Sequence, residues 1–210
     1  MYHAEEVITD MAEIRSVIDG IQAPQRTKVI DHIDTHCRAW IGASPFLVMA
    51  TYDAAGRVDV SPKGDPAGFV AVLDHKTLAV PDRPGNHRFD GFENILQTGR
   101  IGLIFFVPNR NEVVRVNGSA RIVRDREIRR RLAIKDRVPD FAVLVHVEEA
   151  FFHCGKAVIR SGLWRPENAG PIDGLPTYAE ALKEQSGTDQ SLEEVAARLA
   201  YNEKKRLYEE

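Results

Sequence analysis

The sequence predicts a mainly β fold, a six-stranded antiparallel barrel with helices around it. Six short runs are either apolar throughout or alternate between apolar and polar residues, as strands do. Turns rich in Gly, Pro, Asn and Asp separate these runs. Helical patterns occur between only some of them, without the regular strand–helix alternation of a parallel sheet. Together these observations favour an antiparallel barrel.

Two helices are predicted ahead of the barrel, in residues 1–44. The first places apolar side chains three and four residues apart, on one helical face: Val7, Met11, Ile14, Ile18 and Ile21. The second begins near Pro24, a residue suited to the first turn of a helix. Its shared apolar face consists of Val29, Ile33, Cys37 and Trp40. We expect both helices to pack on the barrel.

The barrel itself is predicted in residues 45–165. Its six strands occupy 46–52, 57–61, 77–82, 101–107, 113–123 and 141–147. The turn at 53–56 ends in Gly and predicts a hairpin between the first two strands. Gly118 interrupts the fifth strand and predicts a bulge or bend. Helices are expected at 89–97, 125–132 and 151–163, the first with Phe92, Ile95 and Leu96 facing the core.

A helical extension is predicted for residues 166–210. A loop containing Pro and Gly leads into two helices, at 178–185 and 191–207. Their apolar residues, Val195, Leu199 and Leu207, are too few for a separate core. The extension is therefore expected to lean on the barrel or on a partner.

Composition limits the classes of function. The net charge is −3, which argues against wholesale nucleic-acid binding, and the arginines of 126–131 are interleaved with acids as on a solvated helix face. The N-terminus lacks the apolar core of a signal peptide, and no apolar run reaches the ~20 residues of a membrane helix. With two cysteines, expected to be reduced, the chain is predicted to be cytoplasmic. His32, His36 and Cys37 lie close on one helix, but without a HExxH glutamate no metal site is expected.

Basic side chains follow two neighbouring strands at the turns where those strands end. Lys63 follows the second predicted strand, and Arg83 and Arg88 follow the third. Adjacent strands that bring several cations to one end of a sheet make an anion site. The stretch from Ser61 to Arg88 is therefore the predicted centre of function.

Four ordered motifs in this region resemble one known family. They are SPKGDPAGFV at 61–70, PDRPGN-x-R at 81–88, Asn94-Ile95, and RVNG at 115–118. This set resembles the FMN-binding split-barrel proteins related to pyridoxamine 5'-phosphate oxidase, over roughly residues 46–164. The resemblance implies a split barrel and a homodimer with two FMN sites at the subunit interface. It also implies an oxidoreductase that moves hydride or electrons between FMN and a small organic substrate, with NAD(P)H as a candidate donor.

The resemblance also assigns binding residues. Asp59, Val60, Ser61 and Pro62 are expected along the flavin ring and ribityl chain, with Lys63 near the ring or the phosphate. Val80 and Pro81 are expected to line the opposite wall. Asn86 and Arg88 occupy the place of the phosphate-binding turn, and Arg83 is a rival to Arg88. Asn94 is expected to reach the same phosphate from its helix.

Several assignments stay open. Arg115 either points to solvent or contacts the partner subunit's flavin, and Trp164 either approaches the flavin edge across the dimer or packs in the core. His153, Cys154 and Lys156 receive no role, and no residue is named as an obligatory acid or base.

The family's late Arg-x-His motif, which grips the substrate, is missing, since no His follows Trp164. Little oxidation of pyridoxamine 5'-phosphate is therefore predicted. The alternatives are a non-catalytic flavin- or haem-binding storage or sensor module, and a deazaflavin-dependent reductase.

Overall fold

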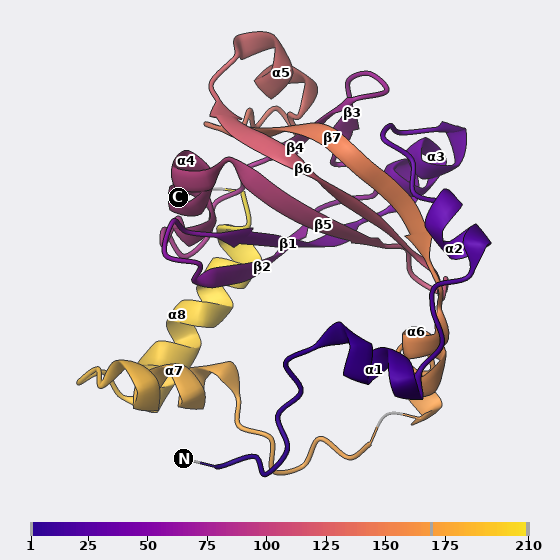
Figure 1. Cartoon of the computed structure of the whole chain (residues 1–210). Helices are drawn as coiled ribbons and strands as arrows, with labels where there is room; N and C mark the ends of the chain where they lie inside the picture. The colour runs from indigo at the N-terminus through magenta and orange to yellow at the C-terminus, as the bar shows by residue number, and fades with distance from the viewer. Residues whose placement is uncertain (1, 169, 209–210) are drawn as a thin grey trace.

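The protein is built around a seven-stranded antiparallel sheet (Figure 1). The computed structural model describes residues 2–168 and 170–208. The strands are β1 (Phe46–Tyr52), β2 (Val58–Gly64), β3 (Ala71–Val72), β4 (Thr77–Pro81), β5 (Arg100–Phe106), β6 (Val113–Val123) and β7 (Ala142–His153). They follow the order β2-β1-β5-β6-β7-β4-β3. The predicted mainly β antiparallel fold is confirmed, and the two-residue β3 is the strand that the sequence did not predict.

The two faces of the sheet differ in what they bury. Along β1, residues alternate between buried and more exposed positions, with Leu47 and Met49 turned to the core. The core continues through β5, β6 and β7, with Phe105, Val116 and Val145 fully buried. On the outer face of β2, Val58 and Val60 remain 69% and 60% exposed. An apolar face at this end of the sheet therefore stays uncovered in the single chain.

Gly118 lies at a break in register between β6 and β7. A Cβ atom there would come within 1.9 Å of the carbonyl oxygen of His146, so only glycine fits. Beyond the break the pairing continues to His153. The prediction of a helix from 151 was therefore wrong at its start: β7 extends to His153, and the helix that follows, α6, is Lys156–Ser161.

The N-terminal helices are shorter than predicted. They are α1 (Met11–Val17), α2 (Ala23–Thr27) and α3 (Thr35–Ala43). The predicted second helix is divided because Ile30 forms a bridge to Ala150 of β7, with both backbone hydrogen bonds made. Asp34 caps the N-terminus of α3, because its carboxylate accepts a hydrogen bond from the Cys37 amide; the helix buries Cys37 and Ile41. α1 buries no residue.

α4 (Asp90–Thr98) covers the end of the sheet near β1 and β2. The contact is close at Gly91, where a Cβ atom would lie 3.0 Å from the Met49 side chain. Asn94 is buried and donates from Nδ2 to Thr51 Oγ1 over 3.0 Å. Ile95 is buried as predicted, but Leu96 is 77% exposed, because the contact face of the helix passes through Gly91, Asn94 and Ile95.

The remaining helices lie after β6. They are α5 (Arg126–Arg131), a short 3-10 helix (Pro166–Asn168), α7 (Tyr178–Ser186) and α8 (Leu192–Lys205). α7 and α8 each begin with a capping box, at Thr177 and Ser191, and pack against each other below the sheet (Figure 1). No helix in the described part of the chain is long and apolar enough to cross a membrane.

Candidate functional site

A pocket of about 300 Å³ lies between β2 and the segment 82–92, which consists of the loop after β4 and the first turn of α4. It brings together many of the residues that the sequence singled out: Asp59, Val60, Ser61, Pro62, Lys63, Arg83, Asn86 and Arg88 all line it. Met49 of β1 and Gly91 of α4 complete its walls. The predicted anion-binding stretch thus forms one concave surface, but the predicted reason was wrong: β2 and β4 are not neighbours in the sheet, and Lys63 lies within β2 rather than in a turn after it.

β2 supplies one wall through its alternation. Asp59, Ser61 and Lys63 are partly covered, while the residues between them are exposed. The hydroxyl oxygen of Ser61 is buried and has no hydrogen-bond partner among the described residues. An unpaired buried polar group costs roughly 1–3 kcal/mol, so this oxygen would gain from a polar ligand. Ser61, with its unpaired hydroxyl, and Lys63 both line this wall of the pocket.

The opposite wall is a sharply turned loop. His87 and Phe89 both have left-handed backbone angles, with φ of 58° and 56°. The Asn86 side-chain oxygen accepts a hydrogen bond from the Arg88 amide over 3.1 Å, which closes the turn. The rings of His87 and Phe89 stack with centroids 6.3 Å apart. This geometry fixes the point at which the Arg88 side chain leaves the loop.

Arg88 is exposed and has an exposed partner. Its Nε donates to Asp90 Oδ2 over 2.6 Å, and the side chain of Arg88 is 70% exposed. The hydrogen bond lowers the pKa of Asp90 below its ordinary value and raises that of Arg88. Because solvent screens such pairs, an incoming anion can displace Asp90 at little cost.

Arg83 is held differently. Its Nε donates to Asp65 Oδ2 over 2.6 Å, and its Nη2 donates to the Leu132 carbonyl over 2.9 Å. The Arg83 side chain is 16% exposed and that of Asp65 is 1% exposed. Arg83 lines the pocket, but its Nε is already used in a buried ion pair and its Nη2 in a hydrogen bond to the backbone.

Other predicted residues lie away from the pocket. Val80 and Pro81 are buried in β4, and neither lines the pocket. Asn94 lines a neighbouring hollow of about 340 Å³, together with Asp59 and Arg88. Val80, Pro81 and Asn94 therefore do not lie in the same cavity as Lys63 within one chain.

Arg115 and Trp164 also make contacts elsewhere in the chain. The Arg115 guanidinium lies over the Phe151 ring, 5.1 Å from its centroid. Trp164 donates from Nε1 to the Arg110 carbonyl over 2.6 Å. By register, Arg115 is on the same uncovered sheet face as Pro62. Arg115 does not line the pocket beside β2.

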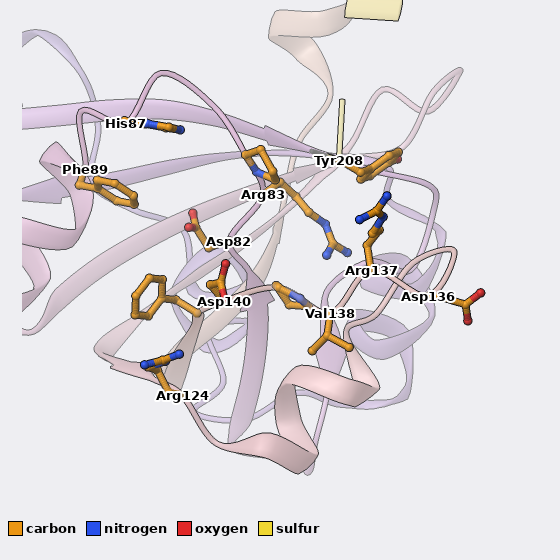
Figure 2. A pocket seen from close by; sticks show the side chains of 13 residues that line it. Asp82, Arg83, His87, Phe89, Arg124, Asp136, Arg137, Val138, Asp140 and Tyr208 are labelled. Atoms are coloured by element: carbon orange, nitrogen blue, oxygen red, sulfur yellow. The ribbon is translucent and has the colours of Figure 1, made fainter. Parts of the chain in front are cut away.

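A second, larger pocket of about 910 Å³ adjoins the first (Figure 2). The two share Arg83, His87 and Phe89, among others. Figure 2 shows His87 and Phe89 on one side of this pocket and Arg83 and Tyr208 on the other. Sequence reasoning did not single out Phe89 or Tyr208. The position of Phe89, directly after Arg88, could have indicated that it lines the site. The sequence around Tyr208 gives no sign that this residue lies in the same pocket as Arg83.

The three residues considered as metal ligands do not share one helix as predicted: His32 precedes α3, whereas His36 and Cys37 lie within it. His32 Nδ1 lies 3.0 Å from the Asp31 carboxylate. The Cys37 thiol is buried, and burial raises its pKa to about 12. Among the described residues, no cluster of three or more His, Cys, Asp or Glu side chains could hold a metal ion.

Comparison with known proteins gives a family match. Residues 33–154 match the family model of pyridoxamine 5'-phosphate oxidase. A search of curated proteins finds no match.

Solved structures with a similar arrangement include HupZ of Group A Streptococcus. It is 24% identical over 57% of this chain and 93% of that chain, with a TM-score of 0.47. A putative pyridoxamine 5'-phosphate oxidase of Lactobacillus delbrueckii is 24% identical over 58% of this chain and 95% of that chain, with a TM-score of 0.46. The heme storage protein HutZ of Vibrio cholerae is 13% identical over 58% of this chain and 94% of that chain, with a TM-score of 0.43.

Proposed function

Because the chain belongs to the pyridoxamine 5'-phosphate oxidase family, we propose that it is a flavoprotein that binds FMN in the pocket between β2 and the 82–92 segment. It would transfer hydride or electrons between FMN and a small organic molecule. The observation that carries the proposal is the convergence of Lys63, Arg88 and the unpaired Ser61 hydroxyl on one cavity.

The residues present fit the two halves of this cofactor. Arg88 would hold the phosphate through a charge-assisted, two-point contact, and Lys63 would add a point charge. Arg88 suits this role better than Arg83, because its present partner is an exposed carboxylate rather than a buried one. The Ser61 hydroxyl would donate a hydrogen bond to a polar atom of the cofactor. The bound flavin would supply the redox chemistry, while the protein positions and tunes it.

A second copy of the chain would complete the site. The outer face of β2 exposes Val58 and Val60, and α1 exposes Met11 and Val17 without a contact that buries them. A homodimer that covers this face would bury well over ~1,000 Å², as specific interfaces do. It would also place Arg115 against the partner. A protein that sediments as a monomer at micromolar concentration with flavin bound would contradict this arrangement.

The decisive experiment is to release the bound ligand by heat from the purified protein and record its absorption and mass. FMN is expected, whereas a deazaflavin or haem would overturn the proposed cofactor. Adding NADPH without air, then readmitting air, tests catalysis: bleaching followed by recovery of the yellow colour supports an oxidoreductase. Bound FMN that no reductant turns over would instead indicate the storage or sensor role.

A further inference from the structure

Three segments far apart in the sequence meet around Arg83. Asp65, just beyond β2, accepts from its Nε over 2.6 Å, and the Leu132 carbonyl at the end of α5 accepts from its Nη2 over 2.9 Å. The third segment is the C-terminal tail, where the Tyr208 hydroxyl donates to Asp65 Oδ1 over 2.7 Å. Both oxygens of a carboxylate that is 1% exposed are therefore used.

The tail belongs to the part of the chain that lies outside the family match, which ends at residue 154. α7 and α8 bury Ala179 and Val195, and they leave larger apolar side chains such as Tyr178 and Tyr201 exposed. α8 then leads back to the sheet (Figure 1), where the Lys135 ammonium lies 5.9 Å from the centre of the Tyr208 ring. The end of α8 and residues 84–87 line a common hollow of about 400 Å³. The tail therefore contacts the site from outside the barrel.

We propose that Tyr208 is a positioning residue: through Asp65 it fixes Arg83, and thereby the turn 83–88 from which Arg88 reaches the cofactor phosphate. The proposal rests on the proposed FMN site, and it gives the C-terminal extension a role in that site. No contact between Tyr208 and the cofactor is required.

The physical reason lies in the burial of Asp65. A buried carboxylate needs all of its hydrogen bonds, because an unpaired oxygen keeps the full cost of losing water. Without the Tyr208 hydroxyl, Asp65 would move toward solvent to regain a partner. Arg83, the first residue of the turn, is joined to Asp65 and would move with it. The same hydrogen bond raises the pKa of Tyr208 above its ordinary value, because the carboxylate stabilises the protonated hydroxyl that donates to it.

The first test needs no ligand. Tyr208→Phe removes only the hydroxyl, and Tyr201→Phe makes the same change at an exposed position of α8. Amide hydrogen exchange of the ligand-free protein is expected to quicken in residues 83–88 of Tyr208→Phe and to stay unchanged in Tyr201→Phe. Unchanged exchange at 83–88 in Tyr208→Phe would overturn the positioning role, whether or not the protein binds FMN.

The second test connects the hydroxyl to the phosphate. Tyr208→Phe is expected to raise the Kd of FMN about fivefold, as loss of a hydrogen bond to a charged group allows, with little change for riboflavin. In an Arg88→Ala background the effect on FMN should disappear, because contacts that act through one group are not additive. Equal losses for FMN and riboflavin together with a lower Tm would show a purely structural role and overturn the proposal. Failure of the unaltered protein to bind FMN would instead overturn the proposed function, and the exchange experiment would still decide the role of Tyr208.

Discussion

The two ends of the turn 83–88 carry the same side chain in opposite settings. Arg83 forms an ion pair with a carboxylate that is 1% exposed, while Arg88 forms one of the same 2.6 Å length with a carboxylate that is 41% exposed. Distance therefore does not distinguish the two pairs, but burial does. A buried pair is costly to break because the remaining charge stays desolvated, whereas an exposed pair contributes little and can be exchanged. One arginine is thus suited to shape the loop and the other to bind a ligand.

The largest expected effect comes from breaking the buried pair. Asp65→Ala should lower the free energy of unfolding by about 3–5 kcal/mol, because it leaves Arg83 largely buried without its counter-charge. Asp90→Ala, which removes the exposed carboxylate, is the matched control and should change stability only slightly. Urea unfolding of both variants measures the difference. Similar losses for the two would mean that burial does not separate the pairs.

An intermediate effect is expected from the exposed arginine. Arg88→Ala should raise the Kd of FMN by roughly one to three orders of magnitude if Arg88 pairs with the phosphate, with no comparable effect on riboflavin, which lacks the phosphate. Arg88→Lys should restore only part of the affinity, because an ammonium cannot make the planar two-point contact. Fluorescence titration of both flavins is the measurement.

Lys63→Ala applies the same comparison of FMN with riboflavin to the other wall of the pocket.

If FMN and riboflavin lose equal affinity in Arg88→Ala, another residue binds the phosphate, and Arg83 is the next to substitute.

The sequence was sufficient for the parts of this comparison that depend on local pattern. Period-two alternation located β2, and the Asn86–Arg88 turn followed from turn chemistry. The sequence alone could not decide which of Arg83 and Arg88 binds the phosphate, because both are arginines beside Pro and Gly. Their difference comes from Asp65, 18 residues from Arg83, and from Tyr208, 143 residues from Asp65. Only the folded chain brings these groups together.

The errors in the fold have the same origin. β7 continues past Glu148 and Glu149 because these residues find partners across the sheet, Arg100 and Asn117. The acidic pair suggests a helix start when it is considered alone. β3 is too short to produce an alternating pattern. Tertiary pairing thus decided the elements whose local signal was weak or misleading.

The smallest expected effect is a titration that reports where Arg88 lies. In the unliganded protein the Arg88 hydrogen bond lowers the pKa of Asp90, so the carboxylate should lose its proton at a lower pH than an ordinary aspartate. If Arg88 turns to the phosphate on binding FMN, Asp90 loses this partner and faces a nearby anion, and both changes raise its pKa. Proton uptake then accompanies binding, so FMN affinity should increase as the pH falls through the acid range in which Asp90 titrates.

Carboxyl-carbon NMR of the free and FMN-bound protein measures this shift directly. Asp31 provides the internal control, because its pKa of about 2 is set by Lys76 and His32, neither of which lines the pocket. A rise at Asp90 with no change at Asp31 would place Arg88 on the phosphate. An Asp90 pKa that stays low in the complex would mean that Arg88 keeps its carboxylate partner, and that the phosphate is held from the Lys63 wall instead.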